Sequence, residues 1–217
     1  MRTLKRLILI LTALTLVAGC KMGGIAGSGT RKTEKKELPA FRAVETSGAF
    51  DVEVTCQKPQ NIEIEADDNL LPLVETDVAD GVLHVGMKQN YHSSKLITLR
   101  ISITDLKRIN INGAGTARIE NVKNEKLEID SAGAAKINAN GETGFVKITN
   151  AGAGLIDVHE LRAAKADVSL SGAGQVEVYA SEQLDVSISG VGRVTYSGHP
   201  KVINKNISGI GTVSARD

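Results

Sequence analysis

Aromatic residues are scarce in this chain, and cysteine and proline are almost as rare. The 217 residues include no Trp, three Tyr, three Phe, two Cys and four Pro. Exposed aromatic rings, the usual platforms for sugars, are therefore few, and Tyr91 with His92 in the polar stretch 88–95 is the best candidate. Because one cysteine belongs to an N-terminal motif, no disulfide is available, and an apolar core alone must hold the fold.

An excess of one charge is also missing. Lys and Arg number 26 and Asp and Glu number 25, which gives a formal net charge of +1 at pH 7. A nearly neutral protein carries no field that would draw it to nucleic acid. We therefore predict no nucleic-acid partner.

Only one long hydrophobic run is present, and it lies at the N-terminus. The run Leu7–Val17 is too short to stay in a bilayer as a spanning helix. It follows three basic residues and precedes small residues and a cysteine: Arg2, Lys5 and Arg6, then Val17-Ala18-Gly19-Cys20. Residues 1–20 resemble a bacterial lipoprotein signal, which implies cleavage before Cys20 and a membrane anchor of acyl chains on its thiol. An uncleaved anchor or an ordinary secretory peptide is the alternative, and Lys21, which is not an acidic retention residue, favours the outer membrane.

The remaining chain divides into three parts. Residues 21–37 are rich in glycine and charge and predict a flexible tether. From 38 to 105, short alternations of apolar and polar residues predict separate strands, as irregular first coils of an array or as a cap. In one of them, Phe50–Cys56, the cysteine falls on the apolar face, which predicts a buried thiol without redox chemistry. Residues 106–217 contain regular repeats.

A short glycine phrase recurs six times in these repeats. The copies are Asn112-Gly113-Ala114-Gly115, Ala132-Gly133-Ala134-Ala135, Ala151-Gly152-Ala153-Gly154, Ser171-Gly172-Ala173-Gly174, Ser189-Gly190-Val191-Gly192 and Ser208-Gly209-Ile210-Gly211. Their first glycines return after 20, 19, 20, 18 and 19 residues, a period typical of one circuit of a solenoid. Apolar residues alternate before and after each phrase, so each repeat is predicted to hold two strands that meet at a small-residue corner.

Repeats of this kind, stacked coil on coil, predict an all-β fold, a parallel β-helix of about 19 residues per coil. At each corner a side chain would obstruct either a positive φ or the close approach of the next coil, which explains the glycines. We assign this structural role to Gly113, Gly115, Gly133, Gly152, Gly154, Gly172, Gly174, Gly190, Gly192, Gly209 and Gly211.

These features together resemble the head GIN domain family of putative autotransporter adhesins. The residues that carry the resemblance are Gly48-Ala49-Phe50-Asp51-Val52, the Leu83–Val85 strand, and the Ser-Gly-Ala-Gly and Ser-Gly-Val-Gly phrases. The resemblance covers roughly residues 40 to 215. It implies a right-handed β-helical domain on the bacterial cell envelope with an adhesin-like role.

Few residues combine into a catalytic pattern. Asp157 and Glu177 follow their glycine phrases at matching places, so we expect them about one strand spacing, roughly 5 Å, apart on the outer face. A glycan-cleaving enzyme needs such a pair, although two acids stacked on a solvated face are more common. The histidines have no zinc spacing: His84, His92, His159 and His199. The glycine phrases open strands rather than the helices of phosphate loops, and we predict no metal and no cofactor.

Three functional hypotheses follow. The first is a lipid-anchored, non-catalytic protein of the cell envelope that acts in adhesion or surface interaction, with a protein or glycan ligand on a strand face. The second is a scaffold that forms homo-oligomers through its coil ends, because the last strand signal leaves an unpaired edge. The third is a glycan-cleaving enzyme that uses Asp157 and Glu177.

Overall fold

Parallel pairing between strands one repeat apart organises the structure, a computed structural model that describes residues 23–216. The strands are β1 (Ile25–Ala26), β2 (Arg31–Lys36), β3 (Ala43–Cys56), β4 (Asn61–Asp67), β5 (Val74–Ala79), β6 (Val82–Met87), β7 (Tyr91–His92), β8 (Ile97–Ile103), β9 (Arg108–Ser131), β10 (Ala134–Asn150), β11 (Ala153–Leu170), β12 (Ala173–Ile188), β13 (Val191–Ser197), β14 (Val202–Ile207) and β15 (Ile210–Ala215). One short 3-10 helix, η1 (Leu71–Leu73), precedes β5. The predicted all-β class is confirmed, and none of the described segments is a helix long and apolar enough to cross a membrane.

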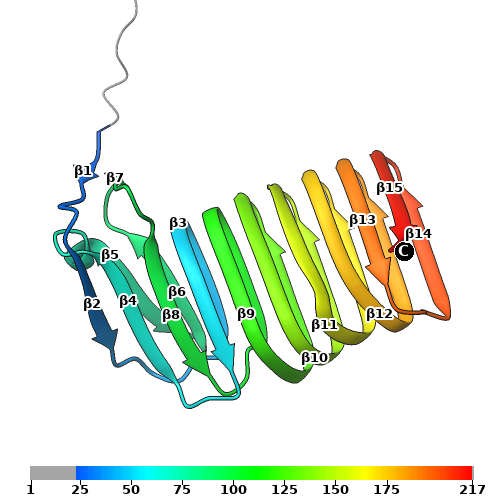
Figure 1. Cartoon of the computed structure of the whole chain (residues 1–217), viewed down its shortest axis with the longest axis horizontal. Helices are drawn as coiled ribbons and strands as arrows, with labels where there is room; N and C mark the ends of the chain where they lie inside the picture. Colours follow the sequence, from blue (N-terminus) through cyan, green and yellow to red (C-terminus); the bar gives the residue numbers. More distant parts are fainter. Residues whose placement is uncertain (1–22, 217) are drawn as a thin grey trace, which may run out of the picture.

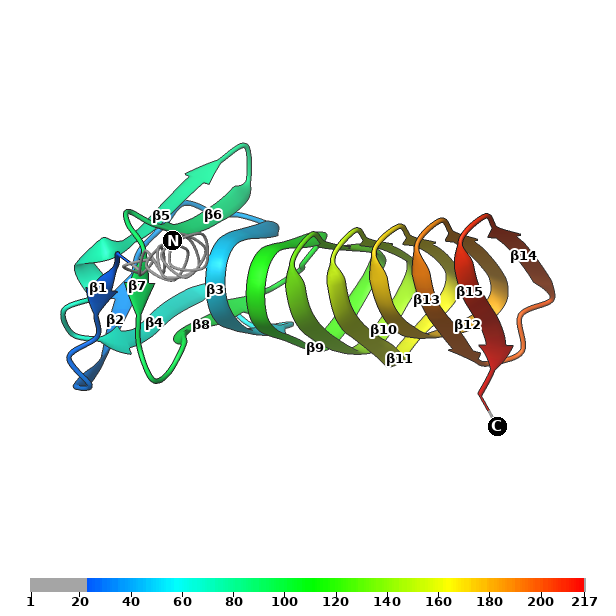
Figure 2. The ribbon, with the colours of Figure 1, turned by 90° about the horizontal axis from the view of Figure 1, so that it is seen from above.

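Strands β9 to β13 lie side by side in the order of the sequence (Figure 1). Each pairs in parallel with the strand one repeat earlier, so that Ile137 lies opposite Ala117 on one side and Ile156 on the other. At the C-terminal end, β13 and β14 both pair with β12, and β15 pairs with β13. Seen from above, the ribbon winds coil after coil around one axis (Figure 2). The register places the glycine phrases of neighbouring coils against one another, as the repeat predicted.

The N-terminal region supplies both a first rung and a cap. Strand β3 pairs in parallel with β9, and Gly48 lies opposite Gly113, so the Ser47-Gly48-Ala49 corner aligns with the repeats. The other edge of β3 pairs with β6 and then with β8. Beyond β8 the sheet continues through β4 to β2, and both of these pairings are antiparallel. Residues 38–105 were predicted to form either irregular first coils or a cap, and the structure contains both: β3 is a first coil, and β8, β4 and β2 form a cap.

Residues 31–36 form strand β2, so the predicted flexible tether over 21–37 is wrong for this part. Strand β2 pairs with β4, beginning with Arg31 opposite Asp67. The preceding loop is also fixed, because the Asn69 amide donates to the Ala26 carbonyl at 2.7 Å and accepts from the Ser28 backbone N–H at 2.9 Å. The charged residues of this segment belong instead to an edge strand, where charge discourages pairing with another chain.

Glu65 on β4 ties this edge strand to the sheet through two arginines. Arg100 Nη1 lies 2.7 Å from Glu65 Oε2, and Arg31 Nε lies 3.2 Å from Glu65 Oε1. The hydrogen bonds from Arg100, and then from Arg31, hold the pKa of Glu65 below its usual value of 4.5. A carboxyl group with a depressed folded-state pKa contributes stability above its unfolded pKa and loses it as the pH falls through the folded pKa.

We therefore expect Glu65→Gln to lower the free energy of unfolding by about 1 kcal/mol at neutral pH, the scale of a solvent-accessible ion pair. The deficit should shrink toward pH 3, below the ordinary pKa of 4.5, because the stability that a depressed pKa contributes is lost as the carboxylate takes up a proton. Urea unfolding at both pH values measures the difference. Glu75→Gln, at an exposed position on β5, is the control and should show no deficit. A Glu65→Gln deficit that is equal at both pH values would contradict the assignment.

Aliphatic side chains that point inward fill the stack. The buried members at the alternating positions of the repeats are Ala117, Ile119, Leu127, Ile129, Ile137, Ala139, Val146, Ile148, Ile156, Val158, Ala166, Val168, Leu170, Val176, Val178, Leu184, Val186, Ile188 and Val194. Each large side chain stabilises the fold by about 1.5 to 3 kcal/mol when fully buried. In the last coil the series changes, because Val213 is only half-buried and Ala215 is exposed.

Close approach between coils explains the corner glycines. A Cβ added to Gly133 would overlap the backbone carbonyl oxygen of Gly113, and one added to Gly152 would overlap that of Gly133. The same relation continues along the stack to the last phrase. Among the predicted corner glycines only Gly113 and Gly115 have a positive φ. Of the two physical reasons considered from the sequence, contact with the neighbouring coil is therefore the general one.

Lys205 lies across the C-terminal end of the stack. It takes the inward position that Val186 occupies one coil earlier, where the valine is 2% exposed. Its Nζ donates to the Val213 carbonyl on β15 at 3.2 Å and lies 5.8 Å from the centre of the Tyr196 ring. A charge that points inward at a sheet edge hinders the addition of another strand.

Candidate functional site on the outer strand face

A column of polar side chains crosses successive coils on the outer face. Arg118 lies opposite Asn138, Asn138 opposite Asp157, Asp157 opposite Glu177, and Glu177 opposite Thr195. Each residue stands between two inward apolar or aromatic positions, so strand alternation turns it away from the core. We call these five residues the polar column. The sequence predicted the matching places of Asp157 and Glu177, and the register confirms them.

A groove of about 350 Å³ lies along the polar column. Its polar lining residues come from β9, β10 and β11: Arg118, Glu120, Asn138, Asn140, Asp157, His159 and Glu160. The lining contains no Phe, Tyr or Trp. Guanidinium, amide, imidazole and carboxylate groups together offer both hydrogen-bond donors and acceptors. The groove is therefore suited to a polar ligand and unsuited to sugar stacking on aromatic rings.

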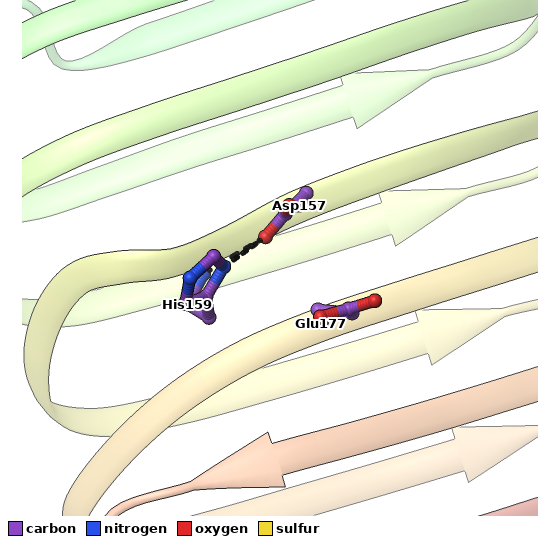
Figure 3. Close-up of side chains that lie close together, drawn as sticks. All are labelled: Asp157, His159 and Glu177. Carbon is purple, nitrogen blue, oxygen red and sulfur yellow. Dashed lines mark hydrogen bonds and ion pairs between the residues drawn. The ribbon is translucent and has the colours of Figure 1, made fainter. Parts of the chain in front are cut away.

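Asp157, His159 and Glu177 gather beside this groove (Figure 3). His159 Nδ1 lies 2.5 Å from Asp157 Oδ1, and one nitrogen or oxygen atom from each of the three side chains lies within 4.8 Å of the others. Asp157 and His159 are two residues apart on β11 and therefore project from the same face. Glu177 joins them from β12. All three residues are half-buried.

Glu177 has two further partners. Gln175 Nε2 donates to Glu177 Oε1 at 2.9 Å, and Arg216 Nη1 donates to Glu177 Oε2 at 2.9 Å. Asp157 is in turn engaged by His159. Both carboxylates are therefore already engaged by donors of the chain itself.

Sequence reasoning missed His159 and Arg216 as members of this cluster. Linear zinc motifs do not contain this arrangement, because His159 on β11 lies close to Glu177 on the adjacent strand β12. The available signal was the two-residue spacing of Asp157 and His159 within one strand. Arg216 follows Glu177 by 39 residues, and no local pattern connects them.

The other predicted binding residues, Tyr91 and His92, lie apart from the polar column on β7. The Tyr91 hydroxyl donates to the Ala49 carbonyl at 2.7 Å, and burial raises the pKa of Tyr91 above its usual value of 10.0. Its ring is half-buried, whereas His92 is exposed. Both residues line a cleft of about 880 Å³ next to Gly48. Tyr91 therefore fixes the β7 loop to the first corner and is not a freely exposed aromatic platform.

Of the two cysteines, only Cys56 lies within the described residues. Cys20 lies outside the described residues, so its lipid attachment stays a prediction. Cys56 is buried, and this burial raises the pKa of its thiol from 9.0 to about 11. Since the thiolate is the reactive form of cysteine, the predicted absence of redox chemistry at Cys56 agrees with its surroundings.

Stacked parallel strands with a polar outer face are typical of repeat proteins that bind partners over an extended surface. The chain belongs to the family described as putative auto-transporter adhesin, head GIN domain, whose sequence profile matches residues 40–200. This membership confirms the resemblance noted in the sequence. An adhesin-type family points to a location at the cell envelope or surface and to a non-enzymatic role.

Solved structures of similar proteins share the fold. A putative adhesin from Bacteroides fragilis is 22% identical, with a TM-score of 0.71 over 89% of this chain and 100% of that one. A putative adhesin from Parabacteroides merdae is 21% identical, with a TM-score of 0.59 over 89% and 99% of the two chains. A putative lipid binding protein from Parabacteroides distasonis is 21% identical, with a TM-score of 0.56 over 90% and 100%. No curated protein matches the chain.

Proposed function

We propose that this protein is a right-handed parallel β-helix, lipid-anchored through Cys20 to the outer membrane, that acts in adhesion or surface interaction without catalysis. The observation that carries the proposal is the polar column with its groove, on an outer face built by consecutive coils. A protein or glycan with hydroxyl, amide or charged groups fits the donors and acceptors of this face. Membership of an adhesin-type family supports the same function.

The length of chain between the anchor and the first strand supports a defined orientation. Strand β1 begins at Ile25, so residues 21–24 alone separate it from Cys20. At about 3.5 Å per residue, the five steps from Cys20 to Ile25 reach no more than about 18 Å. Strands β1 and β15 lie at opposite ends of the stack (Figure 1). A lipid on Cys20 would thus hold the β1 end close to the bilayer and leave the later coils to extend away from it.

Cells that produce the wild type or Cys20→Ser test this function. The wild type should sediment with membranes and promote attachment of the cells to immobilised matrix proteins or glycans, whereas Cys20→Ser should be released and attachment lost. Cys56→Ala is the matched control, because it removes the other cysteine and leaves the predicted anchor in place.

Arg118→Ala with Asn138→Ala should reduce attachment while the protein stays in the membrane fraction. Membrane association of Cys20→Ser would refute the anchor, and unchanged attachment in the groove variant would refute the role of the polar column.

A further inference from the structure

The group formed by Asp157, His159 and Glu177 combines an imidazole with two carboxylates. These donors come from two hydrogen-bonded strands in register, so the backbone fixes where each side chain begins. Their candidate ligand atoms lie within 4.8 Å of one another. Imidazole and carboxylate are the nitrogen and oxygen ligands that zinc and related divalent ions accept, commonly three from the protein with a further position left open.

We propose that Asp157, His159 and Glu177 form a binding site for a zinc-type divalent cation. The sequence predicts no metal site here, because the third ligand is supplied by the next coil and no linear motif contains all three residues. The inference does not rest on the lipid anchor or on adhesion. Asp157 and His159 also line the groove, so a bound cation would lie at its edge and could hold an oxygen atom of a polar ligand.

A second pair of stacked acids on the same two strands shows what distinguishes this group. Asp167 on β11 lies opposite Asp185 on β12, and both are half-buried like Asp157 and Glu177. Asp185 accepts hydrogen bonds from Gln183 at 2.7 Å and from Asn204 at 2.6 Å. Amide donors thus satisfy Asp185, and no histidine joins the pair within the residues that the structure describes. The Asp167 and Asp185 pair therefore provides an internal control.

Binding would rearrange two existing contacts. Two ligands of a tetrahedral zinc ion lie about 3.3 Å apart, given bonds of about 2.0 Å, so Asp157 and His159 must separate from their present 2.5 Å. Glu177 would also exchange the Arg216 guanidinium for the metal. Arg216 is a competing cation, and its removal should strengthen metal binding because it no longer repels the ion or occupies the carboxylate.

Calorimetric titration of the full-length protein, purified in detergent without a histidine tag and stripped with a chelator, tests the site. Zn²⁺ should bind with one ion per chain, whereas Ca²⁺, which prefers six to eight oxygen ligands, should not bind there. His159→Gln and the double variant Asp157→Asn with Glu177→Gln should each weaken Zn²⁺ binding at least about tenfold, which corresponds to 1.4 kcal/mol. Arg216→Gln should tighten binding at least about threefold.

Matched controls separate this site from general attraction of cations to the surface. His199→Gln removes an exposed histidine from another segment, and Asp167→Asn with Asp185→Asn removes the other stacked pair, so both should bind Zn²⁺ like the wild type. Circular dichroism establishes that every variant keeps its strands; if a double variant does not, the single variant Glu177→Gln replaces the double variant of the site, and Asp185→Asn replaces the double variant of the control pair. The proposal is overturned if the wild type shows no saturable one-to-one binding, or if His159→Gln binds as tightly as His199→Gln.

Discussion

Replacement of Gly172 by alanine should destabilise the protein by about 3 kcal/mol, the upper part of the range for overpacking of a close-packed site. Gly172 forms the corner between β11 and β12, in the middle of the stack. Its added Cβ would overlap the Gly152 carbonyl oxygen and lie 2.6 Å from the carbonyl oxygen of Ala151. Because both obstacles are backbone atoms of the neighbouring coil, they cannot move aside as a flexible side chain can. Urea unfolding followed by circular dichroism measures the loss.

Two other glycines, at which an added Cβ has more room, serve as comparisons for the loss of stability. Gly86→Ala, on β6, would place a Cβ no nearer than 3.9 Å to the Ser47 carbonyl oxygen, so the change should stay within about 0.5 kcal/mol. Gly144→Ala, within β10, would bring its Cβ to 2.8 Å from the Glu125 carbonyl oxygen and should fall between the two. If Gly172→Ala unfolds at the same urea concentration as Gly86→Ala, the close approach of coils is not what requires glycine at the corners.

Replacement of Lys205 by leucine should increase self-association about tenfold or more, equivalent to at least 1.4 kcal/mol. The change extends the inward aliphatic series by one residue on the last coil. Large apolar side chains are already exposed around this end: Val191 is 55% exposed, Ile210 76%, Val202 47% and Ile207 42%. With the inward charge removed, a second copy could cover these side chains and pair with the edge of β14 or β15. Sedimentation equilibrium of the Cys20→Ser form measures the association constant.

Lys201→Leu is the control for this prediction. Lys201 is exposed and immediately precedes β14, so its replacement adds the same apolar side chain close to the same end without altering an inward position. Equal association of the two variants would mean that apolar surface alone, and not the inward charge, limits pairing. A larger association constant for Lys205→Leu than for Lys201→Leu would show that Lys205 opposes the homo-oligomeric scaffold predicted from the sequence.

The repeating part of the fold could be predicted from the sequence because each coil meets the same physical demands. The inward series and the corner glycines recur in every repeat, so Ile137, Ile156 and Val176 report the same position in successive coils. Strand β2 lacked such a signal. Its residues are mostly charged, and it is a strand because β4 offers an edge to pair with, which is a tertiary interaction that local sequence does not contain.

The candidate site shows the same division. Asp157 and Glu177 could be placed together because the period predicts which residues of adjacent coils are neighbours. His159 required the further step of combining spacing within one strand with pairing between strands. Arg216 could not be found in this way, because its side chain reaches back from the end of β15 to β12 and the repeat does not determine that path.

Each corner glycine packs against the neighbouring coil. The number of coils, and with it the length of the molecule, can therefore change by whole repeats. The backbone atoms nearest to an added Cβ belong to Gly133 for Gly152, and to Gly152 and Ala151 for Gly172. A duplication or deletion of one repeat would therefore leave the same kind of corner packing between the coils that become neighbours. It would shift the far tip by one strand spacing, about 4.8 Å. The number of repeats thus determines how far from the N-terminal end of the stack a ligand is bound, and this distance can change in evolution by gain or loss of single repeats.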